Sequence, residues 1–226
     1  MINRAQAIVD ILTVFSAYKS RISASDRRLV RQLTNGKLYE LYVLSEVVTG
    51  LVSRGCHLKF LGSSLAFKGS PGMLKASDPH FEVTTPNGDD LWLFVDIEFE
   101  TLGHFHSHIH SSGAGHDDSR RHELDIILVG KNSGYPTHQD IWLGVECKST
   151  AKFTKKIIKE ALGIRRELSF LASHQISKLS SGGAMSPIFV PADPASEFHL
   201  AFIDPKGLSY AISPSSFGIT LRHLAP

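Results

Sequence analysis

Two carboxylates and a lysine stand in two apolar segments near the middle of the sequence. Asp125 lies in the segment ELDIILV, residues 123–129. Glu146 and Lys148 lie at the end of the segment IWLGVECK, residues 141–148. Because side chains two apart in a strand share a face, Glu146 and Lys148 project together. Enough chain separates Asp125 from Glu146 for one strand to end and the next to run alongside. We therefore expect the three side chains to converge at one place on a sheet.

Charged groups at the ends of apolar strands are costly unless they are paired or bind a metal. Two carboxylates suit a hard divalent cation such as Mg²⁺ or Mn²⁺, which takes oxygen ligands and keeps exchangeable waters. A neighbouring ammonium can orient a water and offset the charge of a phosphate. Together these groups predict metal-assisted hydrolysis of a phosphodiester. The alternative is a structural network of ion pairs.

The pattern of Asp125, then Glu146-x-Lys148, then a helix resembles the PD-(D/E)XK nuclease superfamily, which has the restriction-endonuclease-like fold. The similarity covers roughly residues 37–203, and Leu124 stands where the motif has proline. The resemblance implies that Asp125 and Glu146 bind the metal, aided by the backbone carbonyl of Cys147. It implies that Lys148 positions the attacking water. It also implies DNA rather than RNA as substrate, a 5′-phosphate and a 3′-hydroxyl as products, and a role such as restriction of foreign DNA.

Many members of that superfamily add a carboxylate from the preceding helix, and Glu40 matches this position. Glu40 lies among leucines and valines in a helix predicted over residues 37–53. A carboxylate in such surroundings needs a partner. The metal or Lys148 would supply one, and Lys37, three residues earlier, is the alternative.

The segment that follows the Glu-x-Lys motif is strongly basic. Residues 148–166 hold seven lysines and arginines, against Glu160 alone. A row of cations on a helix can contact successive phosphates, so we expect nucleic-acid contacts there. The expected contact residues are Lys152, Lys155, Lys156, Lys159 and Arg166. The alternative is a solvated helix face, and three arginines within residues 27–31 lack the support of an adjacent motif.

A run rich in histidine, serine and glycine covers residues 103–119, where we expect a long loop or a frayed strand extension. Its alternating histidines are His104, His106, His108 and His110. In an extended chain these imidazoles share a face, together with Asp96, Glu98 and Glu100, and such a row binds zinc in some proteins. A zinc-dependent hydrolase built on this run is therefore an alternative to the nuclease, although incidental loop histidines explain it more simply. A catalytically silent nucleic-acid-binding or assembly module of the same fold is another alternative.

The apolar periodicity predicts an α/β sandwich around a mixed central sheet flanked by helices. Helices are expected over residues 2–18, 37–53 and 153–171, with a short basic turn or helix at 27–33 that begins at Ser25-Asp26. Strands are expected over residues 57–61, 81–85, 91–101, 123–129, 141–148, 198–203 and 208–212, with a loop at 180–194. We expect a single domain, residues 1–226, with an N-terminal helical extension at 1–35 and a core at 36–212.

The composition excludes several classes of protein. Of 226 residues, 42% are hydrophobic and the net charge is +2, which rules out a disordered tail, a coiled-coil rod and a globally basic protein. Two cysteines fit a reducing compartment. No segment approaches the roughly 20 apolar residues that span a bilayer, so we expect a cytoplasmic protein without a membrane partner. Because no separate recognition domain is visible, targeting is expected from a homodimer or a partner.

Overall fold

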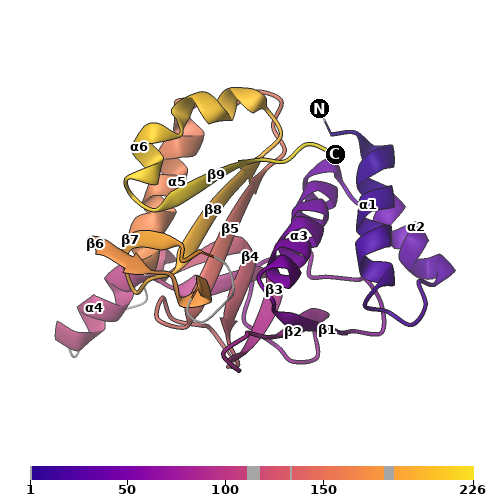
Figure 1. The fold of residues 1–226 in the computed structure, drawn as a ribbon, viewed down its shortest axis with the longest axis horizontal. Coiled ribbons are helices and arrows are strands. Elements are labelled where there is room, and N and C mark those ends of the chain that lie inside the picture. The colour runs from indigo at the N-terminus through magenta and orange to yellow at the C-terminus, as the bar shows by residue number, and fades with distance from the viewer. Residues whose placement is uncertain (1, 111–117, 133, 181–185) are drawn as a thin grey trace.

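A seven-stranded mixed sheet forms the centre of the protein (Figure 1). The computed structural model describes residues 2–110, 118–132, 134–180 and 186–226. In spatial order the strands are β1 (His57–Leu61), β2 (His80–Thr84), β3 (Asp90–Glu100), β4 (Arg121–Gly130), β5 (Ile141–Lys148), β8 (Glu197–Phe202) and β9 (Ile219–His223). Neighbours from β1 to β5 are antiparallel, whereas β5, β8 and β9 run parallel. The expected mixed α/β sheet is confirmed.

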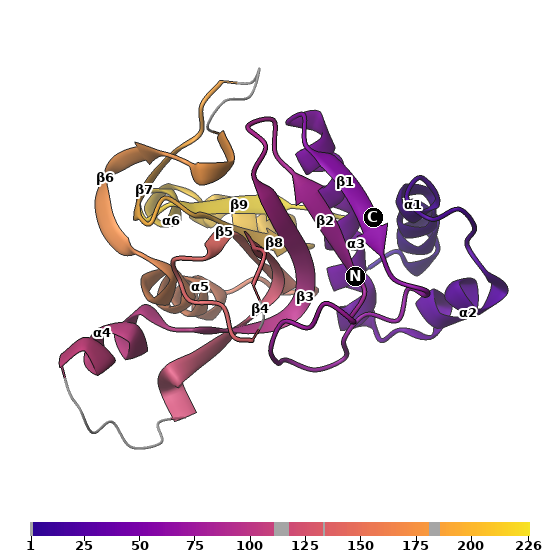
Figure 2. The ribbon, with the colours of Figure 1, turned by 90° about the horizontal axis from the view of Figure 1, so that it is seen from below.

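Helices cover the two faces of this sheet (Figure 2). On one face α3 (Asn35–Ser53) packs against the strands and is itself covered by α1 (Arg4–Ser16). On the other face α5 (Lys155–Leu168) buries Ile157, Ala161 and Leu168. The helix α3 is buried along most of its length because its sequence leaves almost no polar side.

The helix α2 (Ala24–Gln32) is fixed at its N-terminus by a capping box. Ser23 Oγ accepts from the Asp26 backbone N–H, and Asp26 accepts from the Ser23 N–H in return. The helix therefore starts just after Ser23, and not at Ser25-Asp26 as the sequence suggested. Asp26 also accepts from the Leu65 N–H at 2.8 Å, which ties α2 to the connection between β1 and β2.

The histidine-rich run is helical in its first half. The helix α4 (Leu102–His110) replaces the expected loop, and a 3₁₀ turn, η1 (Asp118–Arg120), precedes β4. Free N–H groups at the start of α4 find acceptors, because Thr101 Oγ1 accepts from His104 and a Glu167 oxygen accepts from Gly103. The part of the run at 111–117 lies outside the described residues.

The C-terminal third departs most from the sequence-based prediction. A separate two-stranded sheet of β6 (Phe170–Ile176) and β7 (Phe189–Asp193) occupies part of the expected helix and loop, with η2 (Lys178–Ser180) between the strands. The strand expected at 208–212 is wrong. Because Asp204 accepts from the Lys206 N–H and Pro205 opens a turn, the chain forms η3 (Pro205–Tyr210) and α6 (Ile212–Ser215) before β9.

Candidate metal centre

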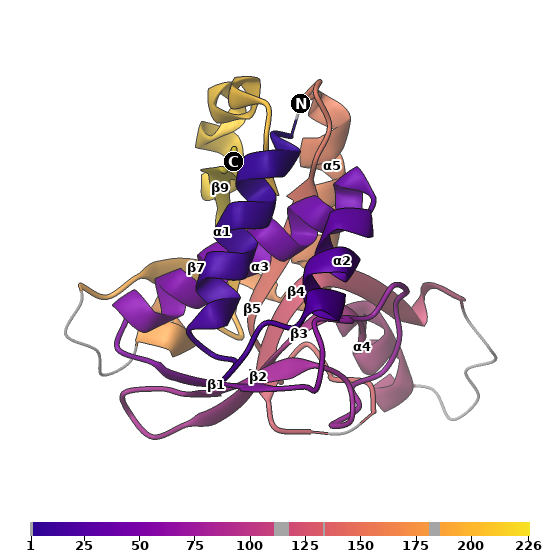
Figure 3. The ribbon, with the colours of Figure 1, turned by 90° about the vertical axis from the view of Figure 1, so that its right-hand side faces the viewer.

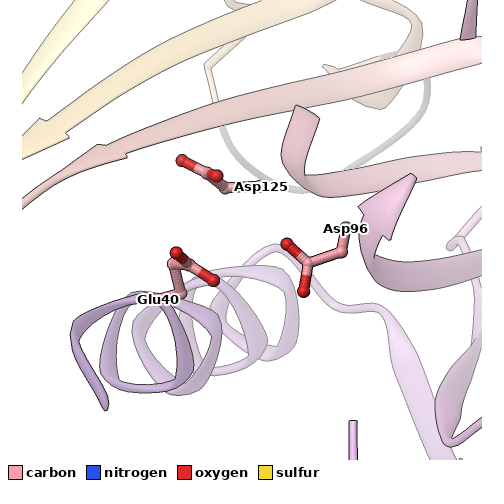
Figure 4. Close-up of side chains that lie close together, drawn as sticks. All are labelled: Glu40, Asp96 and Asp125. Carbon is pink, nitrogen blue, oxygen red and sulfur yellow. The ribbon is translucent and has the colours of Figure 1, made fainter. Parts of the chain in front are cut away.

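Three carboxylates from three different elements point toward one another beside α3 (Figure 4). Glu40 comes from α3, Asp96 from β3 and Asp125 from β4, and one oxygen of each lies within 4.8 Å of the others. Two of them, Glu40 and Asp125, were predicted from the sequence. Asp96 was assigned to a different set, with Glu98 and Glu100.

The side chain of Asp96 joins this cluster because the regular alternation of side chains along β3 is interrupted at that residue. Val95 belongs to the apolar cluster on the α3 side, while Phe94 and Ile97 belong to the cluster on the α5 side. Regular alternation would place Asp96 with Phe94. Instead Asp96 adopts a left-handed backbone conformation with φ 53°, and its carboxylate contacts α3. Aspartate is among the few residues that tolerate this conformation.

In the neighbouring strand β4 the alternation of side chains is interrupted at the same position along the sheet. Ile126 packs on the α3 side, whereas Leu124, two residues earlier, packs on the α5 side. The register pairs Val95 with Ile126 and Ile97 with Leu124, so Asp125 stands next to Asp96 where both strands change face. This shared change of face brings the buried carboxylate of Asp96 and the half-buried carboxylate of Asp125 to Glu40.

Lys37 connects two members of the triad. Its Nζ lies 2.7 Å from Glu40 Oε2 and 2.6 Å from Asp96 Oδ1. The pairing of Lys37 with Glu40, weighed above as the alternative to a metal site, is therefore present. It leaves Asp96 incompletely satisfied: that residue is 1% exposed, and its Oδ2 has no hydrogen-bond partner among the described residues.

Glu146 and Lys148 lie on the α5 face of β5. Asp125 is the member of the triad that contacts this strand. Val145 packs on the α3 side, so Glu146 points to the opposite face. Lys148 Nζ is 3.1 Å from Glu146 Oε2. Asp125 Oδ2 accepts from the Cys147 backbone N–H at 2.6 Å, so the predicted residues gather around Asp125. Glu146 stands outside the triad itself, and the Cys147 carbonyl as a ligand stays a prediction.

The site holds more carboxyl groups than cations. Burial raises the pKa of Glu40 to about 7, against the opposing effect of Lys37. Burial, with the charges of Asp125 and Asp96, raises the pKa of Glu123 to about 7. Burial also raises the pKa of Asp125 and, together with the charge of Asp125, that of Glu146. The pKa values of Glu40, Glu123, Asp125 and Glu146 are raised despite the opposing charges of Lys37 and Lys148, and Asp96 adds a fifth carboxyl group.

This donor set fits a hard divalent cation. Such an ion takes carboxylate oxygens, and the buried Oδ2 of Asp96 has no hydrogen-bond partner among the described residues. Sequence reasoning missed Asp96 and Glu123. The signal for Asp96 was available, because a single acid inside the apolar run LWLFVDI needs a partner for the same reason as Glu40 does.

The basic residues predicted to contact nucleic acid all lie on the surface. Lys152, Lys155, Lys156, Lys159 and Arg166 are exposed along α5 and the segment before it. Arg165, which contributed to the basic count, is buried, and its guanidinium donates to Ser196 and to the Phe217 carbonyl. The five exposed residues therefore do not share the buried, hydrogen-bonded role of Arg165.

Among the described side chains of the histidine-rich run, His104 and His106 do not extend the candidate metal centre. Successive members of an alternating run lie on different sides of a helix, so α4 does not form the row of imidazoles that an extended chain would. His104 and His106 belong to no group of three potential metal ligands among the described residues. The side chains of His108, His110 and His116 lie outside the part that the structure describes.

Comparisons with family models, with curated proteins and with solved structures found no match for this chain. Within the described residues, no helix combines the length and the apolar character needed to cross a bilayer.

Proposed function

We propose that the protein is a nuclease of the restriction-endonuclease-like fold that hydrolyses DNA phosphodiester bonds with Mg²⁺ or Mn²⁺. The observation that carries the proposal is the triad of Glu40, Asp96 and Asp125, in which a buried oxygen of Asp96 lacks a partner among the described residues. These residues would hold the ion, which supplies charge neutralisation at the phosphate and an acidified water. Glu146 completes the anionic surroundings on the other side of Asp125.

The residues of β5 have separate roles in this proposal. Glu146 holds the Lys148 ammonium at 3.1 Å, which fixes the lysine beside Asp125 and leaves it partly exposed to a substrate. Lys148 then orients the attacking water and offsets charge on the phosphate. The Cys147 N–H fixes the Asp125 carboxylate, while the cysteine side chain packs against the α3-side core and takes no part in the chemistry.

The exposed cations of α5 would hold the substrate backbone. Lys155, Lys159 and Arg166 offer contacts that depend on phosphate charge and not on base sequence. Affinity that rests on such contacts falls steeply as salt rises. Selection of a target site would then come from a homodimer or from a separate partner.

The test is a cleavage assay on circular and linear DNA with Mg²⁺, Mn²⁺ or EDTA. We expect metal-dependent products with 5′-phosphate ends, and at least a 100-fold loss of rate in Asp125→Asn and in Lys148→Met, as for removal of a group that stabilises the transition state. Glu82→Gln is the matched control, because Glu82 is a strand carboxylate paired with Lys59 and Lys131 outside the triad.

Metal binding is measured separately, by calorimetry with Mn²⁺. Loss of Mn²⁺ binding in Asp96→Asn and Asp125→Asn, with binding retained in Glu82→Gln, supports the triad as the metal site. Metal binding without cleavage of any DNA would instead favour the catalytically silent module. Stoichiometric, tightly held zinc in the purified protein would favour the zinc-dependent hydrolase.

A further inference from the structure

A cleft of about 190 Å³ opens directly beside the carboxylate triad. Lys37, Glu40 and Asp96 form its polar end. The remainder is mostly apolar and is lined by residues of α2 and its C-cap, of α3, of β3 and of the connection between β1 and β2. Figure 3 labels these helices and strands. An apolar cleft that ends in a few convergent polar groups is the usual form of a small-ligand site.

Phe67 gives the cleft an aromatic wall whose position is fixed from behind. Its ring packs against Phe15, with centroids 5.7 Å apart, and against Phe60, at 5.9 Å. The residue remains partly exposed, and it lines the cleft. A partly exposed ring that is held by two others can stack on a planar group at little entropic cost.

Exposed cations lie on the outward side of α2. Leu29 and the C-cap residue Leu33 line the cleft, whereas Arg27, Arg28 and Arg31 are exposed on the opposite side of this helix. The cations that line the cleft itself are Lys37 and Lys68. None of the three arginines forms an ion pair within the part of the chain that the structure describes. The capping box and the Asp26–Leu65 hydrogen bond fix α2 against the wall that carries Phe67.

We propose that this cleft receives one unpaired nucleobase of a single-stranded nucleic acid, whose strand continues across the outward side of α2, where further phosphates meet the exposed arginines. A base stacked on Phe67 is placed beside Lys37 and the triad, so an adjacent phosphodiester reaches the metal centre; this last step rests on the proposed nuclease function. A base within a duplex is already stacked and paired, so it cannot enter without the cost of being extruded. Stacking on an aromatic side chain is also tolerant of sequence.

The test measures binding in EDTA, where catalysis plays no part. A fluorescein-labelled 15-nucleotide oligothymidine and a duplex of the same length are compared by fluorescence anisotropy. We expect the single strand to bind at least tenfold more tightly. Phe67→Leu, which keeps apolar bulk and removes the aromatic face, should weaken single-strand binding by about 5- to 100-fold. Phe67→Tyr should restore it, and Phe170→Leu, at an exposed aromatic of β6, should change nothing.

The charge on the outward side of α2 is tested by the double variant Arg27→Gln/Arg31→Gln. We expect weaker binding of the single strand and a salt dependence reduced by about 1 to 2 in slope. The control is Lys59→Gln/Lys206→Gln, which removes two exposed cations that belong neither to α2 nor to the cleft lining. Thermal melts confirm that each variant is folded.

The outcomes separate this inference from the nuclease proposal. Equal affinity for single strand and duplex, or unchanged binding in folded Phe67→Leu, overturns the inference even if the protein cleaves DNA. Cleft-dependent binding of single strands without any metal-dependent cleavage upholds the inference and overturns the nuclease function. Binding of oligouridine as tightly as oligothymidine leaves the cleft assigned and extends its substrate class to RNA.

Discussion

The carboxyl group of Glu197 and those of the triad differ in how many of their oxygens have a hydrogen-bond or ion-pair partner. Glu197 of β8 receives both guanidinium nitrogens of Arg54, at 2.8 and 2.9 Å, and the Ser177 hydroxyl at 2.6 Å. Burial alone would raise the pKa of Glu197, but hydrogen bonds from His199 and Arg54 lower the pKa to about 2. At the triad, burial and neighbouring carboxylates raise the pKa of Glu40 to about 7.

The comparison distinguishes a structural ion pair from a binding site. A carboxylate with all its partners in place contributes to stability and needs nothing further. Carboxylates that outnumber their cations are held together by the rest of the fold, and their mutual repulsion is relieved when a proton or a metal cation binds. Perturbed acids of this second kind are typical of functional sites. The four predictions below test that difference, from the largest expected effect to the smallest.

Removal of Glu197 should have the largest effect on stability. Glu197→Ala leaves Arg54 without its partner, and breaking such a pair costs about 3–5 kcal/mol. Urea unfolding monitored by circular dichroism measures the change in the free energy of unfolding. The control is Glu160→Ala on α5, whose contact with Lys156 at 3.7 Å is exposed, and which should cost less than about 0.5 kcal/mol. A small effect of Glu197→Ala would show that the pair is not structural.

Acid should remove the contribution of Glu197. Because its pKa is about 2 in the folded protein, below the unfolded value of 4.5, its ionisation stabilises the fold above pH 4.5. The contribution, about 3 kcal/mol, is lost as the pH falls from 4.5 toward 2. Urea unfolding of the wild type and of Glu197→Gln should therefore give a difference that is about half as large at pH 3 as at pH 7. A difference independent of pH contradicts this account.

A divalent cation should stabilise the triad region. Mn²⁺ at 100 times its dissociation constant should increase the free energy of unfolding by about 2.7 kcal/mol, because it binds only the folded protein. A thermal melt with and without Mn²⁺ measures this effect as a rise in Tm. Asp125→Asn should abolish the rise, while Glu82→Gln should retain it. Equal rises in both variants would place the ion elsewhere.

Neutralising Asp96 should have the smallest effect on stability. Asp96→Asn loses the Lys37 ion pair but relieves repulsion from the nearby carboxylates, so we expect a change within about 1 kcal/mol. Asparagine also tolerates the left-handed backbone at φ 53°. Asp96→Ala should be a further 1–2 kcal/mol less stable, roughly the cost of that conformation for alanine. Urea unfolding of both variants separates the charge of Asp96 from its backbone role.

Much of the fold could be predicted because local patterns specify it. The apolar sequence around α3 indicates a buried helix, and the strands β1 and β5 have the predicted bounds. The two-stranded sheet of β6 and β7 was missed because β6 is largely exposed and neither strand carries an apolar alternation. The helix α4 was missed because acceptors from Thr101 and from Glu167, distant in sequence, complete its first turn.

The sequence by itself determined which residue types could form the site: Asp125, Glu146 and Lys148 were found from chemistry and spacing, and Glu40 from the resemblance to the nuclease superfamily. Only the tertiary structure decided that Asp96 joins Glu40 and Asp125, while Glu146 and Lys148 face α5. The physical reason is that the alternation of side chains is interrupted in both β3 and β4 where they pair, at Asp96 with its left-handed backbone conformation and at the neighbouring Asp125. Strand alternation is a local rule, and the exception to it depends on a neighbouring strand and on a lysine 59 residues away in sequence.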